Sequence, residues 1–272
     1  MSFQLIDQIL SIQPGEQATG LLQPRGGAEG LPLGLLVEAV GQLASWATIP
    51  ELKFDQRPVA ASAGLVEVLQ VPPPGAPLEI EVTITAIRSQ AISYHGSASS
   101  EGTPCLSLQR AIGPLLPMDG FDDKERVKDL FEELCTGGIA PGPTLQASDY
   151  QPTIDLEPGE GRGSGKGIAG SFCLPEESVI YGDHFPRHPV FPATLLLQAQ
   201  IDATRQAYAR PDGSLPEIRE LRGVKIRAFS GPGEQLSFRA IEQKANKSEL
   251  QFRLESSRDE TRVSAATLYL RA

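Results

Sequence analysis

The sequence predicts an α+β protein made of two similar halves, in each of which an antiparallel sheet wraps one central helix. Three observations support this prediction. The same order of features occurs twice along the 272 residues, both expected central helices are apolar nearly all round, and the segments after each helix alternate apolar and polar residues. We expect the two sheets to meet edge to edge, so that one chain forms a pseudo-dimer.

The composition is typical of a globular protein whose partners are small molecules or other proteins. The net charge is −10, whereas nucleic acids and anionic membrane surfaces attract basic proteins. No apolar run approaches the roughly 20 residues that span a bilayer, and the first residues do not resemble a secretory signal. The three cysteines have neither disulfide-framework nor metal-ligand spacing. We therefore expect a cytoplasmic protein without nucleic-acid or membrane partners.

The segment 119–148 separates the two halves and contains one expected helix. Its apolar side chains follow the i, i+3, i+4, i+7 spacing of an amphipathic helix at Val127, Leu130, Phe131 and Leu134. We expect Asp122 or Asp123 to cap the start of this helix and Gly137 to end it. The predicted domains are a first half of residues 1–118, this linker of residues 119–148, and a second half of residues 149–272.

In each half an apolar helix follows a proline. The residues after Pro32 read LGLLVEAVGQLASW, and those after Pro192, 160 positions later, read ATLLLQAQIDATRQ. Both segments are apolar on most of their surface, as expected of a helix that a sheet surrounds.

A turn that contains proline and glycine follows each helix and opens a strand. After Pro74 and Gly75 the residues alternate strictly, with the apolar ones at Leu78, Ile80, Val82 and Ile84. After Gly231 and Gly233 the alternating apolar residues are Leu236, Phe238 and Ala240, and then Leu250, Phe252 and Leu254. One buried helix cupped by antiparallel strands, present twice, is the hotdog arrangement. The sequence therefore predicts a double hotdog.

The segment YGDHFPRHPVFP, residues 181–192, runs directly into the second helix. Its three prolines restrict the backbone and hold His184 in a rigid loop. An arbitrary histidine is more often structural than catalytic, but this context makes His184 a candidate functional residue. His188 and His95 lack the same context, and we expect both to be surface or core residues.

This segment resembles the 3-hydroxyacyl-[acyl carrier protein] dehydratase family, whose motif is His-Phe-Pro, two residues, Pro, two residues, Pro, Gly and a helix with a catalytic acid. The matching residues are His184, Phe185, Pro186, Pro189 and Pro192. The opening FQLIDQILSIQPG and the later GVKIRAF are also similar to that family. The resemblance covers both halves. It implies a dehydratase of acyl thioesters bound to acyl carrier protein or coenzyme A, in fatty acid or polyketide biosynthesis, without a metal or other cofactor.

The two halves depart from this motif in complementary ways. The family places its acid fourteen residues after the histidine, where this chain has Gln198, an amide that cannot transfer a proton. Aligned from Pro32, the first half has Glu38 at the acid position, but no His-Phe-Pro precedes it. The loop that would carry this histidine is nine residues shorter than its counterpart. Because the family combines the histidine of one subunit with the acid of the other, the resemblance implies one composite site of His184 and Glu38. The twin site, marked by Gln198, would be silent.

The resemblance also implies roles for these residues. Neutral His184 would remove the proton from C2 of a 3-hydroxyacyl thioester, while Glu38 donates a proton to the leaving hydroxyl at C3. A solvent-facing helix position is the alternative for Glu38, but its apolar neighbours favour a buried, neutral acid. The carbonyl of Val190 would orient His184. Thioester contacts are expected at Phe191, Gln42 and the backbone N–H groups of Ala193 and Leu33, which begin the two helices.

Other readings of the sequence stay open. Arg222, Lys225 and Arg227 form a basic patch that the resemblance assigns to docking of an acyl carrier protein, and a solvated strand face explains them equally well. The chain could also be a catalytically silent thioester-binding or partner protein, or a hotdog thioesterase. The retained histidine loop favours a dehydratase over a thioesterase but does not exclude a silent protein. Acyl chain length and any homo-oligomer beyond the pseudo-dimer do not follow from the sequence.

Overall fold

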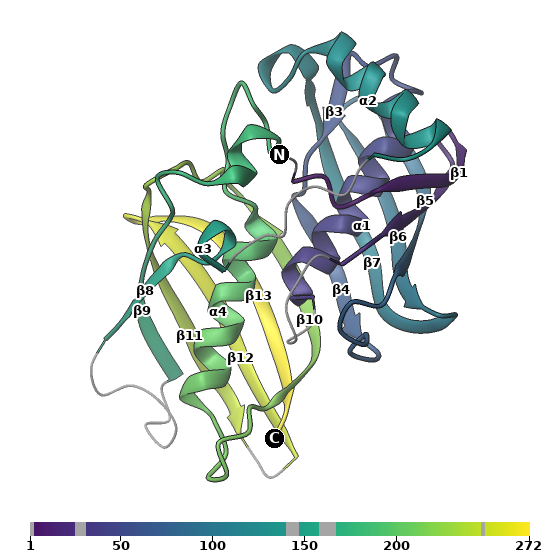
Figure 1. Ribbon diagram of the computed structural model, residues 1–272. Coiled ribbons are helices and arrows are strands. Elements are labelled where there is room, and N and C mark those ends of the chain that lie inside the picture. The colour runs from purple at the N-terminus through teal and green to yellow at the C-terminus, as the bar shows by residue number, and fades with distance from the viewer. Residues whose placement is uncertain (1–2, 25–30, 140–146, 158–166, 246–247) are drawn as a thin grey trace.

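Each half of the chain contributes one long helix, α1 (Leu33–Thr48) or α4 (Ala193–Ala207), and the strands that curve around it (Figure 1). The computed structural model describes residues 3–24, 31–139, 147–157, 167–245 and 248–272. None of the helices in these ranges is long and apolar enough to cross a membrane.

The strands of both halves form one continuous antiparallel sheet. The first half supplies β1 (Gln8–Gln13), β2 (Gln17–Leu22), β3 (Gln56–Pro58), β4 (Ser62–Val68), β5 (Leu78–Arg88), β6 (Ala91–Ser100) and β7 (Thr103–Pro117). The second half supplies β8 (Thr153–Leu156), β9 (Gly167–Cys173), β10 (Glu217–Ile226), β11 (Gln235–Ala245), β12 (Glu249–Arg258) and β13 (Thr261–Arg271). The order is β1-β2-β5-β6-β7-β4-β10-β13-β12-β11-β9-β8, with β3 paired to β7.

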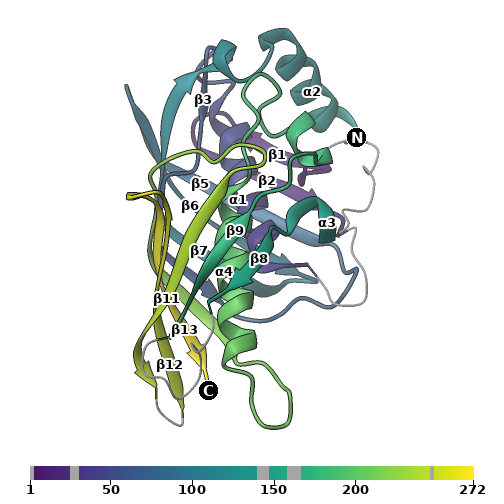
Figure 2. The ribbon, with the colours of Figure 1, turned by 90° about the vertical axis from the view of Figure 1, so that its left-hand side faces the viewer.

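The two halves join where β4 pairs with β10. Leu65 lies opposite Arg222 in this antiparallel pair, and Ser62 lies opposite Lys225. The expected edge-to-edge pairing is therefore present within one chain. Figure 2 shows both central helices on the same side of the sheet, so the space between them borders both halves.

The alternating apolar residues of the sequence face the helices and form the core. In β5 every second residue from Leu78 to Ile84 is buried while its neighbours are exposed. In the second half Phe172 and Phe238 stack with ring centroids 4.2 Å apart. Because strand side chains alternate between faces, one register places all of these residues inside.

Glycines allow α1 to approach its surroundings closely. A Cβ at Gly96 on β6 would lie 2.6 Å from Cγ1 of Val40, and a Cβ at Gly34 would lie 2.7 Å from the carbonyl oxygen of Thr194. Such separations are shorter than van der Waals contact, so only glycine fits at either position. The contact at Gly34 brings the start of α1 against the start of α4.

The segment between the halves contains η1 (Met118–Gly120), α2 (Lys124–Thr136) and α3 (Ala147–Tyr150), and η2 (Val179–Gly182) follows in the second half. Asp123 caps α2 by accepting hydrogen bonds from the N–H groups of Glu125 and Arg126. Val127 and Leu134 of α2 are buried against the first half, and the Phe131 ring packs 6.2 Å from that of Trp46. The domain boundaries proposed from the sequence stay a prediction.

Candidate active site

The loop from Asp183 to Pro192 carries His184 to the junction of the two halves. The backbone N–H of His184 donates to the carbonyl of Ile180 at 2.8 Å. Phe185 has a φ of +68°, a left-handed conformation that a bulky residue rarely adopts. Its buried ring compensates for this strain by packing.

His184 and Glu38 face each other across the two halves. Nε2 of His184 lies 3.7 Å from Oε1 of Glu38, and the two side chains are 12% and 11% exposed. Nδ1 of His184 lies 2.7 Å from the carbonyl oxygen of Val190. Because a carbonyl only accepts, Nδ1 carries the ring hydrogen and Nε2 presents its lone pair toward Glu38.

The surroundings of His184 favour the neutral imidazole. Burial lowers the pKa of His184 below its ordinary value of 6.5, and the positive charge of Arg57 acts in the same direction. The charge of Glu38 and the bond to the Val190 carbonyl oppose this shift. Burial is the largest of these effects, so the site favours the neutral imidazole, whose Nε2 carries no proton.

Glu38 is held by the opposite helix. Its Oε2 accepts a hydrogen bond of 2.9 Å from the hydroxyl of Thr194, in the first turn of α4. The Glu38 carboxyl group, from the first half, is therefore held in position by a residue of the second half.

The substrate-contacting residues expected from the sequence all line the same cavity, but only some of them have backbone or side-chain polar groups that are free to bind a substrate. This cavity lies between α1, α4 and the sheet, is mostly apolar, and is lined by His184, Glu38, Val190, Phe191, Ala193, Leu33 and Gln42, among others. In α4 the first helical hydrogen bond is donated by Leu195, so the N–H groups of Ala193 and Thr194 have no acceptor within the helix.

Two of these residues use their polar groups elsewhere. The N–H of Phe191 donates to the carbonyl of Ser230 at 2.7 Å. The amide of Gln42 accepts from the N–H of Leu5 and donates to the carbonyl of Phe3. Gln42 therefore anchors the N-terminal segment beside the site.

Arg57, which the sequence did not single out, lies beside the histidine loop. Its side chain is 13% exposed, forms an ion pair of 3.7 Å with Asp122, and lies 4.8 Å from the ring centre of Phe185. Burial lowers the pKa of Arg57 to about 10, against the opposing charge of Asp122. Asp122 also forms an ion pair with Arg126 of α2.

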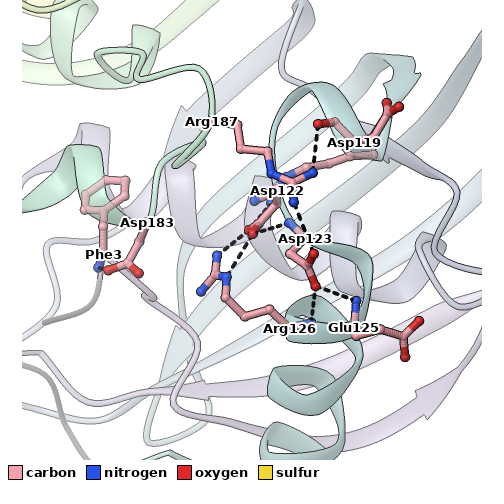
Figure 3. A network of polar contacts seen from close by, with 9 residues as sticks. Phe3, Asp119, Asp122, Asp123, Glu125, Arg126, Asp183 and Arg187 are labelled. Atoms are coloured by element: carbon pink, nitrogen blue, oxygen red, sulfur yellow. Dashed lines mark hydrogen bonds and ion pairs between the residues drawn. The ribbon is translucent and has the colours of Figure 1, made fainter.

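The linker holds the histidine loop through polar contacts, which Figure 3 shows, and through an aromatic contact. Arg187 donates to the carbonyl of Asp119 and to the carboxylate of Asp123, each at 3.1 Å. The ring of Phe121 packs 4.9 Å from that of Phe185. From the sequence, Asp122 or Asp123 was expected only as a cap of α2, and the contact of Asp123 with the histidine loop was not predicted.

The N-terminal segment packs against the histidine loop through Phe3. The N–H of Phe3 donates to the Asp183 carboxylate at 2.7 Å, and the Phe3 ring meets the His184 ring edge-on with centroids 5.7 Å apart. The FQLID opening of the sequence, noted above only as a likeness, thus packs directly against His184.

Gln198 lies at the twin position. Its Oε1 accepts from the N–H of Gly34 at 2.8 Å, and its Nε2 donates to Asp202 at 2.9 Å. A second cavity borders Gln198, Asp202 and Leu36. The first-half loop that would carry a second histidine falls largely in residues 25–30, outside the described residues.

The remaining sequence candidates lie on the surface. Arg222, Lys225 and Arg227 are exposed, but Arg222 pairs with Glu220 at 2.9 Å and lies over the Tyr269 ring. His95 is exposed. His188 is also exposed, and its ring packs 5.8 Å from that of Phe121.

Comparison with known proteins identifies the family resemblance and the fold. Residues 161–266 match the family model described as ApeI-like, ApeI dehydratase. No curated protein sequence matches the chain. The match covers most of the second half and confirms the predicted resemblance to hotdog dehydratases.

Solved structures match nearly the whole chain. The tesB protein of Mycobacterium avium subsp. paratuberculosis is 13% identical, with 99% of this chain and 97% of that chain covered and a TM-score of 0.62. An acyl-ACP thioesterase from Bacteroides thetaiotaomicron VPI-5482 is 10% identical over 93% and 97%, with a TM-score of 0.54. A MaoC-like dehydratase is 12% identical over 90% and 85%, with a TM-score of 0.56. These similarities confirm the predicted double hotdog fold.

Proposed function

We propose that this double hotdog protein, which resembles the hotdog dehydratases, removes water from 3-hydroxyacyl thioesters at one composite active site. The observation that carries the proposal is the position of His184 Nε2, which faces the Glu38 carboxyl group at 3.7 Å in a mostly apolar cavity. A base and an acid so placed can act on adjacent carbons of one substrate.

The proposed reaction breaks a C–H and a C–O bond. Nε2 of neutral His184 takes the proton from C2, and the electron pair of that C–H bond forms the C2=C3 double bond. Protonated Glu38 gives its proton to the C3 hydroxyl, which leaves as water. The imidazolium and carboxylate that result are returned to their starting forms by proton transfer between them or through solvent.

The start of α4 supports the charge that develops on the thioester. Loss of the C2 proton moves negative charge onto the thioester oxygen. The N–H groups of Ala193 and Thr194 point out of the helix start, where backbone donors and the helix dipole stabilise such charge. The family motif has glycine where this chain has Ala193, and the methyl group leaves the N–H in place.

The carrier of the acyl group is part of the proposal. Acyl carrier proteins are acidic, and exposed Lys225 and Arg227 would attract them, with Arg227 adjacent to the cavity-lining Ala228. The ion pair between Arg222 and Glu220 weakens the contribution of Arg222. A cytoplasmic location and a role in fatty acid or polyketide synthesis are consistent with the three free cysteines and with the substrate class, and both stay predictions.

A thioesterase is the second candidate, because the same fold occurs in structures described as acyl-ACP thioesterase and tesB protein. In that reaction Glu38 would activate a water for attack on the thioester carbonyl, and the product would be a free thiol. The alternative of a silent thioester-binding protein predicts neither product.

One assay distinguishes the three functions. A crotonyl thioester is incubated with the protein, and loss of enone absorbance and release of free thiol are followed in parallel. We expect enone loss without thiol release, with at least a hundredfold lower rate for His184→Ala and for Glu38→Gln. His188→Ala, in the same loop, is the matched control and should retain the rate.

Each other result points to a different function. Thiol release that depends on Glu38 would identify a thioesterase. Binding of the thioester without either reaction would identify a silent binding protein.

A further inference from the structure

Tyr94, a buried residue, borders the active-site cavity with its hydroxyl group unpaired among the described residues. The residue lies on β6, is 7% exposed, and lines the same cavity as His184 and Glu38. Within the ranges that the structure describes, the hydroxyl forms no hydrogen bond. The side chain is thus buried while its hydroxyl borders the cavity, so the hydroxyl is free to bind a group that enters the cavity.

Two glycines shape the space in front of this hydroxyl. Gly96, two residues further along β6, lets Val40 of α1 approach the strand closely, as described above. Gly41, the next residue of α1, lies opposite the Tyr94 ring, and a methyl group added there would lie 3.8 Å from the Tyr94 hydroxyl oxygen. The missing side chain at Gly41 therefore leaves the hydroxyl facing open cavity.

The Tyr94 hydroxyl is available as a hydrogen-bond donor. Burial raises the pKa of Tyr94 above its ordinary value of 10, and the negative charge of Glu38 raises it further. The hydroxyl therefore keeps its hydrogen throughout the range in which proteins of this kind operate. It can therefore donate that hydrogen to an acceptor atom of a substrate.

The position of Tyr94 relative to Glu38 indicates which part of a substrate it meets. Gly41 follows Glu38 by three residues on α1, a displacement of about 4.5 Å along the helix. For an extended acyl chain that runs parallel to α1 from C3 at Glu38 toward Gly41, about three or four further carbon–carbon bonds of about 1.5 Å each cover that distance. The hydroxyl then faces the chain near C6 or C7.

We propose that the Tyr94 hydroxyl donates a hydrogen bond to an oxygen atom of the acyl chain beyond C3, so that oxygenated acyl thioesters are the preferred substrates. The inference rests on the proposed dehydratase function, because it takes C3 to lie at Glu38. A site that bonds a substrate oxygen discriminates against an all-carbon analogue, since the analogue leaves the buried donor unpaired.

The test uses 2-enoyl thioesters of one length in which an ether oxygen replaces the methylene at position 5, 6 or 7. An ether oxygen accepts a hydrogen bond but cannot donate one, and it is close in size to a methylene. We expect hydration of one of these three compounds with a kcat/KM about tenfold above that of the all-carbon chain. Equal values for all four compounds would overturn the proposal.

The Tyr94→Phe variant locates the preference at the hydroxyl. Within this variant, kcat/KM for the preferred ether chain should fall to the value for the all-carbon chain. Tyr269→Phe, whose ring lies under Arg219 and Arg222 at the surface, is the matched control and should keep the preference for the ether chain. An equal loss of rate on all four chains in Tyr94→Phe would place the hydroxyl at the reacting centre and would contradict a role in chain selection.

Binding measurements separate this inference from the proposed function. Calorimetric binding of the same four thioesters to the His184→Ala variant reports the preference without turnover. Preferred binding of an ether chain, lost in His184→Ala combined with Tyr94→Phe, would support the inference even if the wild type hydrated none of the compounds. Hydration of all four without any preference in rate or binding would overturn the inference alone.

Discussion

Gln198 occupies the position in α4 that Glu38 occupies in α1, and each side chain accepts a hydrogen bond from the start of the opposite helix. Glu38 accepts from the Thr194 hydroxyl, and Gln198 accepts from the N–H of Gly34. The pseudo-symmetry of the double hotdog is therefore retained in geometry, while the acid is retained on one side only. This difference leads to the first prediction.

We expect Glu38→Gln to abolish hydration of a crotonyl thioester, with a fall of about 10² to 10⁴ in kcat, because an amide cannot transfer the proton. The variant should fold, since the amide of Gln198 occupies the matching environment. Adding Gln198→Glu should not restore activity, because the proposed base, His184, faces Glu38. Rescue by the double change would contradict the single composite site.

The pH dependence should reflect the lowered pKa of His184. The base form persists as the pH falls through the ordinary value of 6.5, so the acid limb of kcat/KM should lie below pH 6.5. The same lowered pKa makes the protein less stable as the pH falls below 6.5, because His184 in the unfolded chain is protonated at a higher pH than in the folded chain. The loss of stability is complete once the pH lies below the pKa of His184 in the folded state. A profile of kcat/KM against pH checks the first point. An acid limb above pH 6.5 would contradict the neutral, buried histidine.

Replacement of Arg57 should shift this acid limb. The positive charge of Arg57 lowers the pKa of His184, so Arg57→Met should move the limb to higher pH while methionine retains the packing on Phe185. Asp122 keeps Arg126 as a partner, so no carboxylate is left buried without a cation. Arg126→Met removes the other partner of Asp122 and should leave the limb in place. An equal shift in both variants would refute a direct effect of Arg57.

The contact of the Phe121 ring with the Phe185 ring, which joins the linker to the histidine loop, should affect the rate of hydration. Phe121→Ala removes the ring that packs on Phe185, and we expect at least a tenfold fall in kcat at a temperature where the protein is folded, because His184 loses its position. Phe131→Ala removes a ring of similar size that packs on Trp46 and Phe54. Phe121→Ala should lose about 3 kcal/mol or more of stability in denaturant unfolding, and Phe131→Ala, whose ring is only partly buried, should lose less. Phe131→Ala is the control and should keep the kcat of the wild type, because the Phe131 ring packs on Trp46 and Phe54 instead of on the histidine loop. An equal fall of kcat in both variants would contradict a specific role for Phe121.

Replacement of the two glycines of α1 by alanine should change the stability of the protein in opposite directions. Gly34→Ala would bring Cβ within 2.7 Å of the Thr194 carbonyl oxygen, so we expect a loss of about 1–3 kcal/mol in the free energy of unfolding. Gly41→Ala has an ordinary contact at 3.8 Å, and the higher helix propensity of alanine should stabilise the protein by about 0.5–1 kcal/mol. Urea unfolding of both variants measures the difference. Similar effects at the two positions would contradict the close crossing of α1 and α4.

The fold could be predicted from the sequence because its signals are local. The alternation from Leu78 to Ile84 is a property of one strand, and the prolines at 32 and 192 mark helix starts directly. The repeat of this order in both halves was sufficient to predict paired sheets. The juxtaposition of His184 with Glu38, 146 positions apart, was accessible only through the family resemblance, because neither local pattern specifies the other.

Patterns along the chain thus predicted the double hotdog and the rigid histidine loop, and the family resemblance implied the loss of the acid at Gln198. Three-dimensional packing alone determined that Arg57 and Phe121 brace that loop and that the Tyr94 hydroxyl opens into the cavity. Each of these contacts joins segments from separate strands, helices or the linker. Which of them meet depends on strand register and on how closely α1 approaches β6 and α4, and these distances are set by packing of the whole core rather than by any local sequence pattern.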